Sequence, residues 1–365
     1  MVQCALILIG GMIFTSCDKA HSGDDVAMAG VDLSASACAN CYIVSMSGQY
    51  MFKAVKGNSD ASVGSAASAV ILWETFGTNT APVPGDLIKN VSYKDGYVFF
   101  QTADVFKEGN AVIAVKDADD VILWSWHIWM TDQPEEHVYY NDAGTMMDRN
   151  LGAISTTPGD PGALGLSYQW GRKDPFLGPA YATANIAAQS TIGKLVKESS
   201  EDEAKGTIEY AIANPATFIT YNSSNYDWYY SWRDKMENTR WTESCYPKSI
   251  YDPCPAGWRV PDGGPEGVWA KASALANLFK VTSDEEKHGI DFSGVLGDSP
   301  SIWYPASGYR DTKGGLTKIG LLGFYWSAST MDYSAYMLRI GYEGTVVSAS
   351  YNSRANACCV RCAKE

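Results

Sequence analysis

Short runs of alternating apolar and polar residues fill the chain between residues 38 and 132. This period-2 pattern is typical of strands that bury one face. Asp95-Gly96, between two of the runs, predicts a type I′ hairpin turn, because both central positions of that turn need positive φ. Seven strands in roughly 95 residues are typical of an immunoglobulin-like β-sandwich. The predicted strands are Tyr42–Val44, Tyr50–Val55, Val70–Trp73, Val91–Lys94, Tyr97–Thr102, Ala111–Val115 and Val121–Met130.

The last of these runs is apolar on both faces. Alternation places Trp124, Trp126, Ile128 and Met130 on one side, and Leu123, His127 and Trp129 on the other. We therefore expect this strand to be buried between two domains, with His127 as a hydrogen-bonded interior histidine rather than a catalytic base.

From about Gln133 the composition and the pattern of the sequence change. Glycine, proline and aromatic residues become frequent, and apolar residues no longer recur at a regular spacing. Apolar positions on one stripe predict a helix over Pro265–Phe279, and Ala187–Glu198 is a weaker helix candidate. The region is expected to be an α+β domain, residues 133–365, with long loops. Its predicted C-terminal strands are Trp326–Ser329, Ala335–Tyr342, Thr345–Ala349 and Cys359–Ala363.

The N-terminus has the pattern of an export signal. Ala5–Phe14 is an unbroken apolar run, and Thr15-Ser16-Cys17 follows it like a bacterial lipobox. The run is too short to cross a membrane, which takes about 20 residues. We expect residues 1–16 to be a signal peptide, Cys17 to be lipidated and residues 17–37 to be a tether. The protein is then expected to be an outer-membrane lipoprotein that its lipid anchor holds at the cell surface. No Lys or Arg precedes the run, so either the true start lies upstream or the α-amine supplies the charge; a buried strand is the alternative reading.

The net charge of the chain limits the classes of partner that it can bind. The chain has 28 Lys plus Arg against 41 Asp plus Glu, a net charge of -13. Nucleic acids and anionic membrane surfaces need a basic footprint, so the sequence argues against both. Only four histidines are present, and the acidic turn Asp117–Asp120 lacks the glycine and the downstream Glu of an EF-hand. We therefore expect no metal and no cofactor, and we interpret this turn and the pairs Glu135-Glu136 and Asp202-Glu203 as solvated surface.

Seven cysteines remain after Cys4 in the leader and the expected lipid site Cys17. Cys38 and Cys41 have the spacing of a redox or zinc motif, but no second such pair and no nearby His completes a zinc site. We expect a structural or idle role for them. Near the C-terminus, Cys358, Val360 and Cys362 should share one face of a strand and Cys359 the other. The pairing of Cys38, Cys41, Cys245, Cys358 and Cys359 stays open.

Six ordered elements of the second region resemble the Fibrobacter succinogenes major paralogous domain, a family of Bacteroidota surface lipoproteins. The resemblance covers about Tyr139–Glu365, and the residues before it look like the module that commonly precedes this domain. The matching elements are Asn150-Leu151-Gly152, Gly165-Leu166-Ser167-Tyr168-Gln169-Trp170-Gly171, Asp252-Pro253-Cys254-Pro255-Ala256-Gly257-Trp258-Arg259-Val260-Pro261, Pro305-Ala306-Ser307-Gly308-Tyr309-Arg310, Tyr325-Trp326-Ser327-Ala328-Ser329 and Val360-Arg361-Cys362.

The resemblance implies a variant of the C-type lectin fold, with a disulfide between Cys254 and Cys362. A bridge over about a hundred residues would stabilise the domain by up to about 5 kcal/mol on the chain-entropy argument. Calcium-dependent sugar binding is not implied, because Ser327-Ala328 follows Trp326 and Gln133-Pro134-Glu135 lies outside the expected region. The related formylglycine-generating oxidases use a cysteine pair, which Cys358 or Cys359 could form with Cys362 only if Cys362 were not in the bridge.

Candidate ligand contacts lie in the aromatic stretch Tyr226–Arg233 and in Arg240-Trp241. The residues are either core or a stacking platform for sugar rings or protein side chains. As binding residues we predict Trp228, Tyr229, Arg233 and Trp241.

No nucleophile elbow, P-loop, Rossmann glycine set or HExxH motif is present. The sequence therefore favours a non-catalytic, calcium-independent binding or adhesion module whose ligand is a glycan or a protein. The alternatives are an accessory or tip subunit of a surface polymer, and an enzyme of unknown reaction. The oligomeric state is not indicated.

Overall fold

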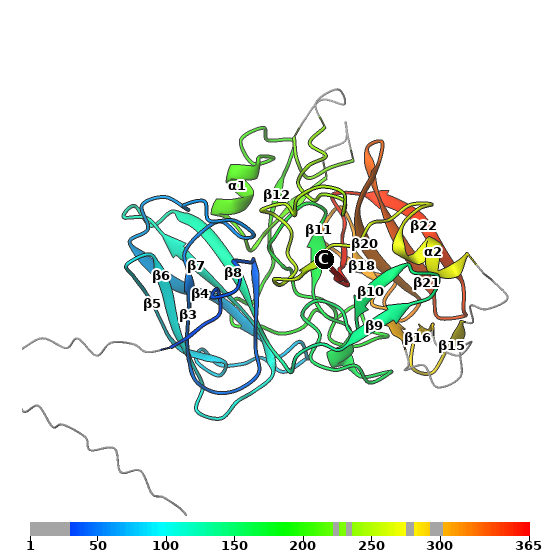
Figure 1. The fold of residues 1–365 in the computed structure, drawn as a ribbon, viewed down its shortest axis with the longest axis horizontal. Coiled ribbons are helices and arrows are strands. Elements are labelled where there is room, and N and C mark those ends of the chain that lie inside the picture. The colour runs from blue at the N-terminus through cyan, green and yellow to red at the C-terminus, as the bar shows by residue number, and fades with distance from the viewer. Residues whose placement is uncertain (1–29, 222–225, 231–235, 275–280, 293–301) are drawn as a thin grey trace, which may run out of the picture.

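The computed structural model describes residues 30–365 except 222–225, 231–235, 275–280 and 293–301. The fold is mostly β, with 38% strand and 5% helix. An N-terminal pair of sheets lies beside a C-terminal region that carries the remaining sheets and the two α-helices of the described residues (Figure 1). The expected signal peptide, Cys17 and most of the expected tether lie outside the described residues.

The N-terminal part, here called the sandwich, contains two four-stranded sheets. All seven predicted strands are present, within two or three residues of the expected bounds. An added strand, β1, pairs in parallel with β3, so the end of the segment that we expected to be tether belongs to the fold. Sheet A has the order β1(Val31–Asp32), β3(Gln49–Lys53), β6(Tyr97–Thr102), β5(Ile88–Lys94). Sheet B has the order β2(Cys41–Val44), β8(Ile122–Met130), β7(Gly109–Lys116), β4(Ser68–Thr75).

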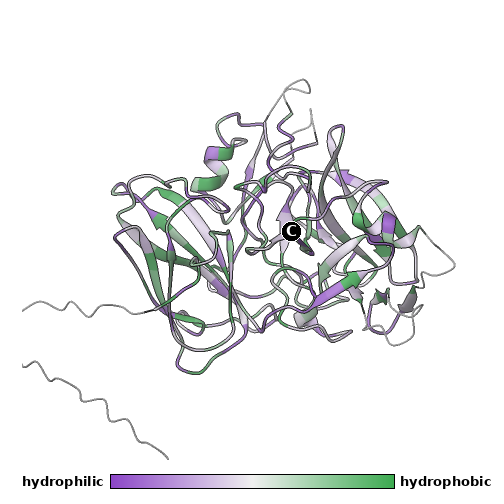
Figure 2. Cartoon of the chain, in the orientation of Figure 1, coloured by the Kyte–Doolittle hydropathy of each residue, from purple (hydrophilic) through white to green (hydrophobic). Residues whose placement is uncertain are grey.

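Alternating side chains of the two sheets build one shared core. Phe52 of β3 and Phe100 of β6 point inward and pack with Trp126 of β8, whose ring lies 5.1 Å from that of Phe52. Figure 2 shows apolar positions concentrated along these strands. The predicted hairpin is confirmed, because Asp95 and Gly96 have φ of 50° and 82° and join strands β5 and β6.

Strand β8 is buried on both faces, as its pattern predicts. Trp126 belongs to the sandwich core, whereas Trp129 belongs to the main core of the C-terminal region. Between them, His127 Nε2 lies 2.8 Å from Asn110 Oδ1, and Nδ1 lies 3.5 Å from the Tyr168 hydroxyl. Burial lowers the pKa of His127 to about 3, so the ring is neutral, as expected of an interior histidine.

The C-terminal region (residues 133–365) is built on a seven-stranded sheet. Along it lie β19(Leu316–Thr317), β18(Tyr309–Arg310), β23(Ala357–Cys359), β20(Leu322–Met331), β21(Ser334–Gly341) and β22(Val346–Ser353), with β11(Ser167–Gln169) also pairing with β23. A four-stranded sheet has the order β14(Trp258–Arg259), β24(Ala363–Lys364), β10(Gly144–Met147), β9(Glu136–Tyr139). The smaller sheets are β12(Val196–Ser199) with β13(Thr217–Thr220), and β15(Thr282–Asp284), β16(Gly289–Asp291), β17(Trp303–Pro305).

The C-terminal region contains less helix than is usual for the α+β domain that the sequence predicts. The helices α1(Ile208–Ala213) and α2(Val268–Ser273) have six residues each, and a 3₁₀ turn spans Pro161–Ala163. Helix α2 lies inside the predicted helix, part of which falls outside the described residues. The prediction of a helix over Ala187–Glu198 is wrong. There Gln189 N donates to Thr78 O and Thr191 N to Glu74 O, so this segment bonds to the sandwich instead of to itself.

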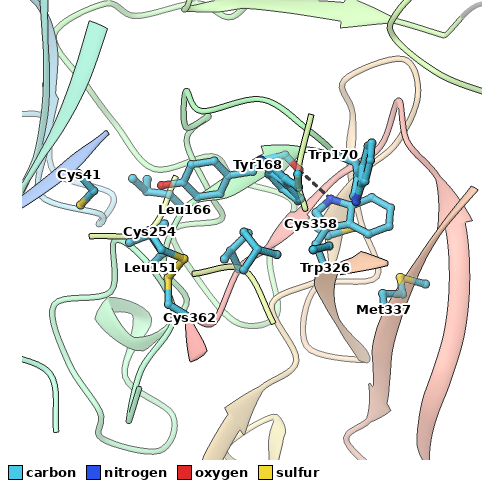
Figure 3. Packing of buried hydrophobic residues seen from close by; sticks show 14 of the residues in the cluster. Cys41, Leu151, Leu166, Tyr168, Trp170, Cys254, Trp326, Met337, Cys358 and Cys362 are labelled. Carbon is cyan, nitrogen blue, oxygen red and sulfur yellow. Dashed lines mark hydrogen bonds between the residues drawn. A yellow bond between two sulfur atoms is a disulfide. The ribbon is translucent and has the colours of Figure 1, made fainter. Parts of the chain in front are cut away.

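The Cys254–Cys362 disulfide expected from the resemblance is present, with 6.0 Å between the Cα atoms. It borders the main core of the C-terminal region (Figure 3), in which Trp326 Nε1 donates to Tyr168 O at 2.8 Å. The predicted last strand is divided into β23 and β24. The alternation nevertheless holds: Cys358, Val360 and Cys362 enter this core, whereas Cys359 packs in another cluster.

Candidate functional site

The aromatic stretch predicted to contact a ligand turns out to be largely interior. Trp228 is 1% exposed and donates its indole N–H to Trp170 O at 2.8 Å. Trp241 is 0% exposed and donates to Tyr251 O at 3.0 Å. Neither ring can stack on a ligand in this conformation. The prediction that Trp228 and Trp241 form a binding platform is therefore wrong, and the core interpretation holds for both.

Buried arginines pack against Trp228 and against its hydrogen-bond partner Trp170. The guanidinium carbon of Arg240 lies 4.6 Å from the Trp228 ring centre and 5.1 Å from that of Trp170, and Arg354 lies 4.6 Å from Trp170. Asp227 forms ion pairs with both arginines. Stacking on aromatic faces and a shared carboxylate offset the cost of burying two cations. The Arg–Trp cluster is thus a structural element of the C-terminal region.

Among the described residues of the stretch, those beside the buried pair Asp227 and Trp228 reach solvent. Tyr229 is partly buried, with its ring 6.2 Å from that of Trp228 and at 77° to it. Tyr226 is 47% exposed. Residues 226–229 form bends rather than a strand, so their side chains do not alternate between two faces. Arg233 lies outside the described residues.

A serine, a lysine and an aspartate meet where the sandwich joins the C-terminal region. Ser125 Oγ donates to Asp174 Oδ1 at 2.6 Å, and Lys173 Nζ lies 2.6 Å from Ser125 Oγ and 2.7 Å from Asp174. Burial lowers the pKa of the Lys173 amine. This combination resembles a nucleophile with a base. However, all three side chains are buried, and the cavity beside Lys173 and Asp174 holds only about 10 Å³, too little for a substrate.

A larger cavity of about 450 Å³ opens at the same junction, on the surface. Its volume falls within the range of small-ligand sites, about 300–1,000 Å³. We call it the junction groove. Its walls come from the sandwich residues Ser34–Cys38, Lys53 and Asn58–Asp60 and from Lys248, Ala256–Gly257 and Glu365 of the C-terminal region.

Two asparagines fix the groove by joining the sandwich to the loop before the disulfide. Asn58 has a positive φ of 57°, and its side-chain amide donates to Ser249 O at 2.7 Å and to Asp252 O at 3.1 Å. Asn40 lies deeper and donates to Ile250 O at 2.7 Å and to Asp252 O at 2.8 Å. Four amide-to-carbonyl bonds at one junction hold the two walls in a fixed relation.

The polar groups of the groove include both charge signs. Lys248 Nζ donates to Cys254 O and Pro255 O at 3.1 and 2.9 Å and pairs with Glu365 at 3.2 Å. Lys53 Nζ lies 4.0 Å from Asp60. The lining contains serines, an asparagine and alanines but no aromatic ring. Such a site can exchange several hydrogen bonds with a polar ligand.

The Cys38-Ala-Asn-Cys41 motif supplies the groove with a thiol and the junction with Asn40. Burial, reinforced by the charge of Asp60, raises the pKa of Cys38. Burial also raises the pKa of Cys41, and neither sulfur is bonded to another cysteine. Protonated thiols are weak nucleophiles. The structural or idle role expected of the two cysteines stays a prediction, and the contacts that join this motif to the C-terminal region come from the asparagine between them, which the spacing argument passed over.

In the described segments, no three His, Cys, Asp or Glu side chains gather in a way that could hold a metal ion. The acidic turn Asp117–Asp120 satisfies itself, since Asp117 Oδ1 accepts from the main chain of Asp119 and Val121 at 2.9 Å. None of the helices in the described part of the chain is long and apolar enough to span a membrane. Comparison with family models, with curated proteins and with solved structures gave no match.

Proposed function

We propose that this chain is an outer-membrane lipoprotein, anchored through Cys17 and displayed at the cell surface, that acts as a non-catalytic binding or adhesion module. In this proposal the sandwich is an immunoglobulin-like domain and the C-terminal region a C-type-lectin-like domain of the major paralogous family. Two sheets with one shared core support the first assignment. The Cys254–Cys362 bridge supports the second. The ligand is a glycan or a protein, bound without calcium.

The junction groove is the observation that carries this proposal. It combines a ligand-sized volume with polar groups from both parts of the chain. The amides of Asn40 and Asn58 fix its walls before any ligand arrives, and preorganised sites lose less entropy on binding. Lys53 and Asp60 provide a donor and an acceptor at its mouth.

Catalysis has less support than binding. The Ser125, Lys173 and Asp174 cluster is the arrangement in the described structure that most resembles a nucleophile with its base, and it is sealed. The vicinal cysteines give no alternative, because Cys362 is already bonded to Cys254. Burial raises the pKa of Cys359 to about 11, so its thiol is protonated near neutral pH.

A role in a surface polymer has one favourable observation. Strand β22 lies at the edge of the seven-stranded sheet and could accept a strand from another subunit. Strand β4, at the edge of sheet B, is different. Glu74 bonds with Thr191 through both its N–H and its C=O, at 3.0 and 3.1 Å, so this edge is already partly occupied.

The test is a panel of glycans and host proteins screened with the lipid-free chain and with a groove-filling variant, Ser36→Trp. Ser36 is exposed and lines the groove, so the indole should exclude ligand without disturbing the core. Ser65→Trp places the same ring on an exposed loop outside the groove and is the matched control. The proposal predicts at least a roughly tenfold loss of affinity in the first variant alone. Equal affinity in wild type and Ser36→Trp would refute a ligand site in the groove.

A further inference from the structure

The outward face of sheet A carries an aromatic patch that the core does not use. Tyr50 and Phe52 of β3 point into the sandwich. Their strand neighbours Met51 and Lys53 therefore point outward. On β6 the same alternation turns Tyr97 and Phe99 outward, and both are partly exposed. Their ring centres lie 6.3 Å apart at 44°.

Strand register surrounds these rings with two lysines, with amides and with one carboxylate, because Asp32 of β1 pairs with Met51 in the Phe99 row. Tyr97 lies directly between Lys53 of β3 and Lys94 of β5. Phe99 lies between Met51 and Ser92 in the next outward row. The row beyond holds Gln49, Gln101 and Asn90, with Asn90 Nδ2 donating to Gln101 Oε1 at 3.4 Å.

We propose that this outer face binds a polysaccharide that carries carboxylate or sulfate groups. The face of an aromatic ring is a suitable surface for the C–H groups of a pyranose ring. The lysines on either side of Tyr97 lie where they can pair with acidic substituents of the same sugar. The amide row offers donors and acceptors to hydroxyl groups of the neighbouring residue. The inference rests on the proposed function, because it specifies the ligand class of a binding module.

Charge favours this ligand over a second copy of the chain. In a two-fold contact that sets the Lys53, Tyr97, Lys94 row against the same row of a second copy, facing lysines repel. An acidic polymer has the complementary sign at this row, although the whole chain has a net charge of -13. Local attraction can prevail because salt screens charges beyond about 8 Å at physiological ionic strength.

Lys53 also connects this face with the junction groove, because it lines the groove and lies in the Tyr97 row. Its amine is 4.0 Å from Asp60, which is a long ion pair between exposed side chains, so an incoming anion can compete for the amine. A bound polymer chain that follows the rows toward β3 therefore reaches the mouth of the groove.

The experiment compares dextran sulfate and polygalacturonate with uncharged dextran, all tested against the lipid-free chain. We expect both acidic polymers to bind and dextran to bind at least about tenfold more weakly. Tyr97→Ala should weaken binding of the acidic polymers about tenfold, and the double variant Lys53→Ala/Lys94→Ala should remove most of the salt dependence. Tyr351→Ala and Lys116→Ala, at strand positions outside sheet A, are the matched controls and should change nothing.

Outcomes separate this inference from the proposed function. Equal binding by wild type and Tyr97→Ala, or equal binding of dextran and dextran sulfate, overturns the inference. If neither acidic polymer binds while a ligand sensitive to Ser36→Trp is found, the inference fails and the proposed function stands. If binding of the acidic polymers depends on Tyr97 and is unaffected by Ser36→Trp, the inference stands and the groove loses its assigned role. Circular dichroism of each variant establishes that it is folded.

Discussion

The side-chain amide of Asn40 donates to the main-chain carbonyl of Asp252 across a sequence separation of 212 residues. At the same time its Oδ1 accepts the indole N–H of Trp124 at 3.0 Å. One short side chain therefore joins the sandwich core to the loop that carries Cys254. Gly57 packs against it: a Cβ at this position would lie 2.0 Å from Asn40 Oδ1, so a larger residue would displace the Asn40 amide from its hydrogen bonds.

Asn40→Ala should destabilise both parts of the chain together. It removes the partner of Trp124 Nε1 and of two carbonyls, and each buried polar group left unsatisfied costs about 1–3 kcal/mol. Urea unfolding followed by tryptophan fluorescence measures the loss. The exposed amide variant Asn90→Ala should shift the midpoint little. An Asn40→Ala protein as stable as Asn90→Ala would contradict the anchoring role.

Cys254→Ser should lower the free energy of unfolding by roughly 2–5 kcal/mol, because the bridge closes a loop between residues 108 positions apart. Both bridge cysteines are buried, so the lost packing adds to the effect. Cys245→Ser changes an exposed, unbonded cysteine and is the control. Non-reducing peptide mapping should recover Cys254 linked to Cys362. A fragment linking Cys254 to Cys245 would be incompatible with the structure.

His127 should make the protein less stable in acid. The folded ring has a pKa of about 3, against an ordinary value of 6.5, so between these limits only the unfolded chain takes up the proton. Its contribution is fully present above pH 6.5 and is lost as the pH falls toward 3, by about 1.4 kcal/mol per pH unit. Unfolding midpoints at several pH values measure the slope, which should be shallower in His127→Gln. A ring proton signal that titrates near pH 6.5 in the folded protein would refute this prediction.

Trp228→Ala should cost about 3–5 kcal/mol, the usual loss for a large buried ring. The change also removes a cation–π partner of Arg240. Tyr229→Ala, next to it and partly buried, should cost less. Thermal melts of the two variants give the comparison. If Trp228→Ala melted with the wild type, the Arg–Trp cluster could not be a stabilising element.

Local pattern predicted the sandwich well because its strands alternate cleanly and its hairpin turn uses Asp95-Gly96, a pair with a strong backbone preference. The double-sided burial of β8 was also visible, since Trp126 and Trp129 fall on opposite sides of the strand. The sequence predicted less where distant partners decide the outcome. For example, a helix is predicted over Ala187–Glu198, but Thr191 in this segment forms a hydrogen bond with Glu74 at the edge of β4.

In the candidate site, too, the features that depend on distant residues were not predicted from the sequence. Trp228 was expected near a ligand because a dense aromatic stretch reads equally as core or as surface. Its burial depends on Arg240, and on the distant Arg354 through their shared partner Asp227. The groove could not be predicted at all, because its walls belong to segments that meet only in the folded chain. Asn40 lies between Cys38 and Cys41, and the prediction for this motif rested only on the chemistry of the two cysteines.

The last two strands have a consequence for biosynthesis. Strand β23 lies between β18 and β20, and β24 lies between β14 and β10, so neither is at the edge of its sheet. Within the described residues these two strands follow all the others along the chain, so a ribosome adds them later than the strands that they join. Until these strands are made, each sheet lacks an interior strand, and the strands on either side of the gap expose unpaired main-chain N–H and C=O groups. A product that stops before Ala357 therefore cannot complete either sheet, and proteases should remove it while chains that contain both strands survive.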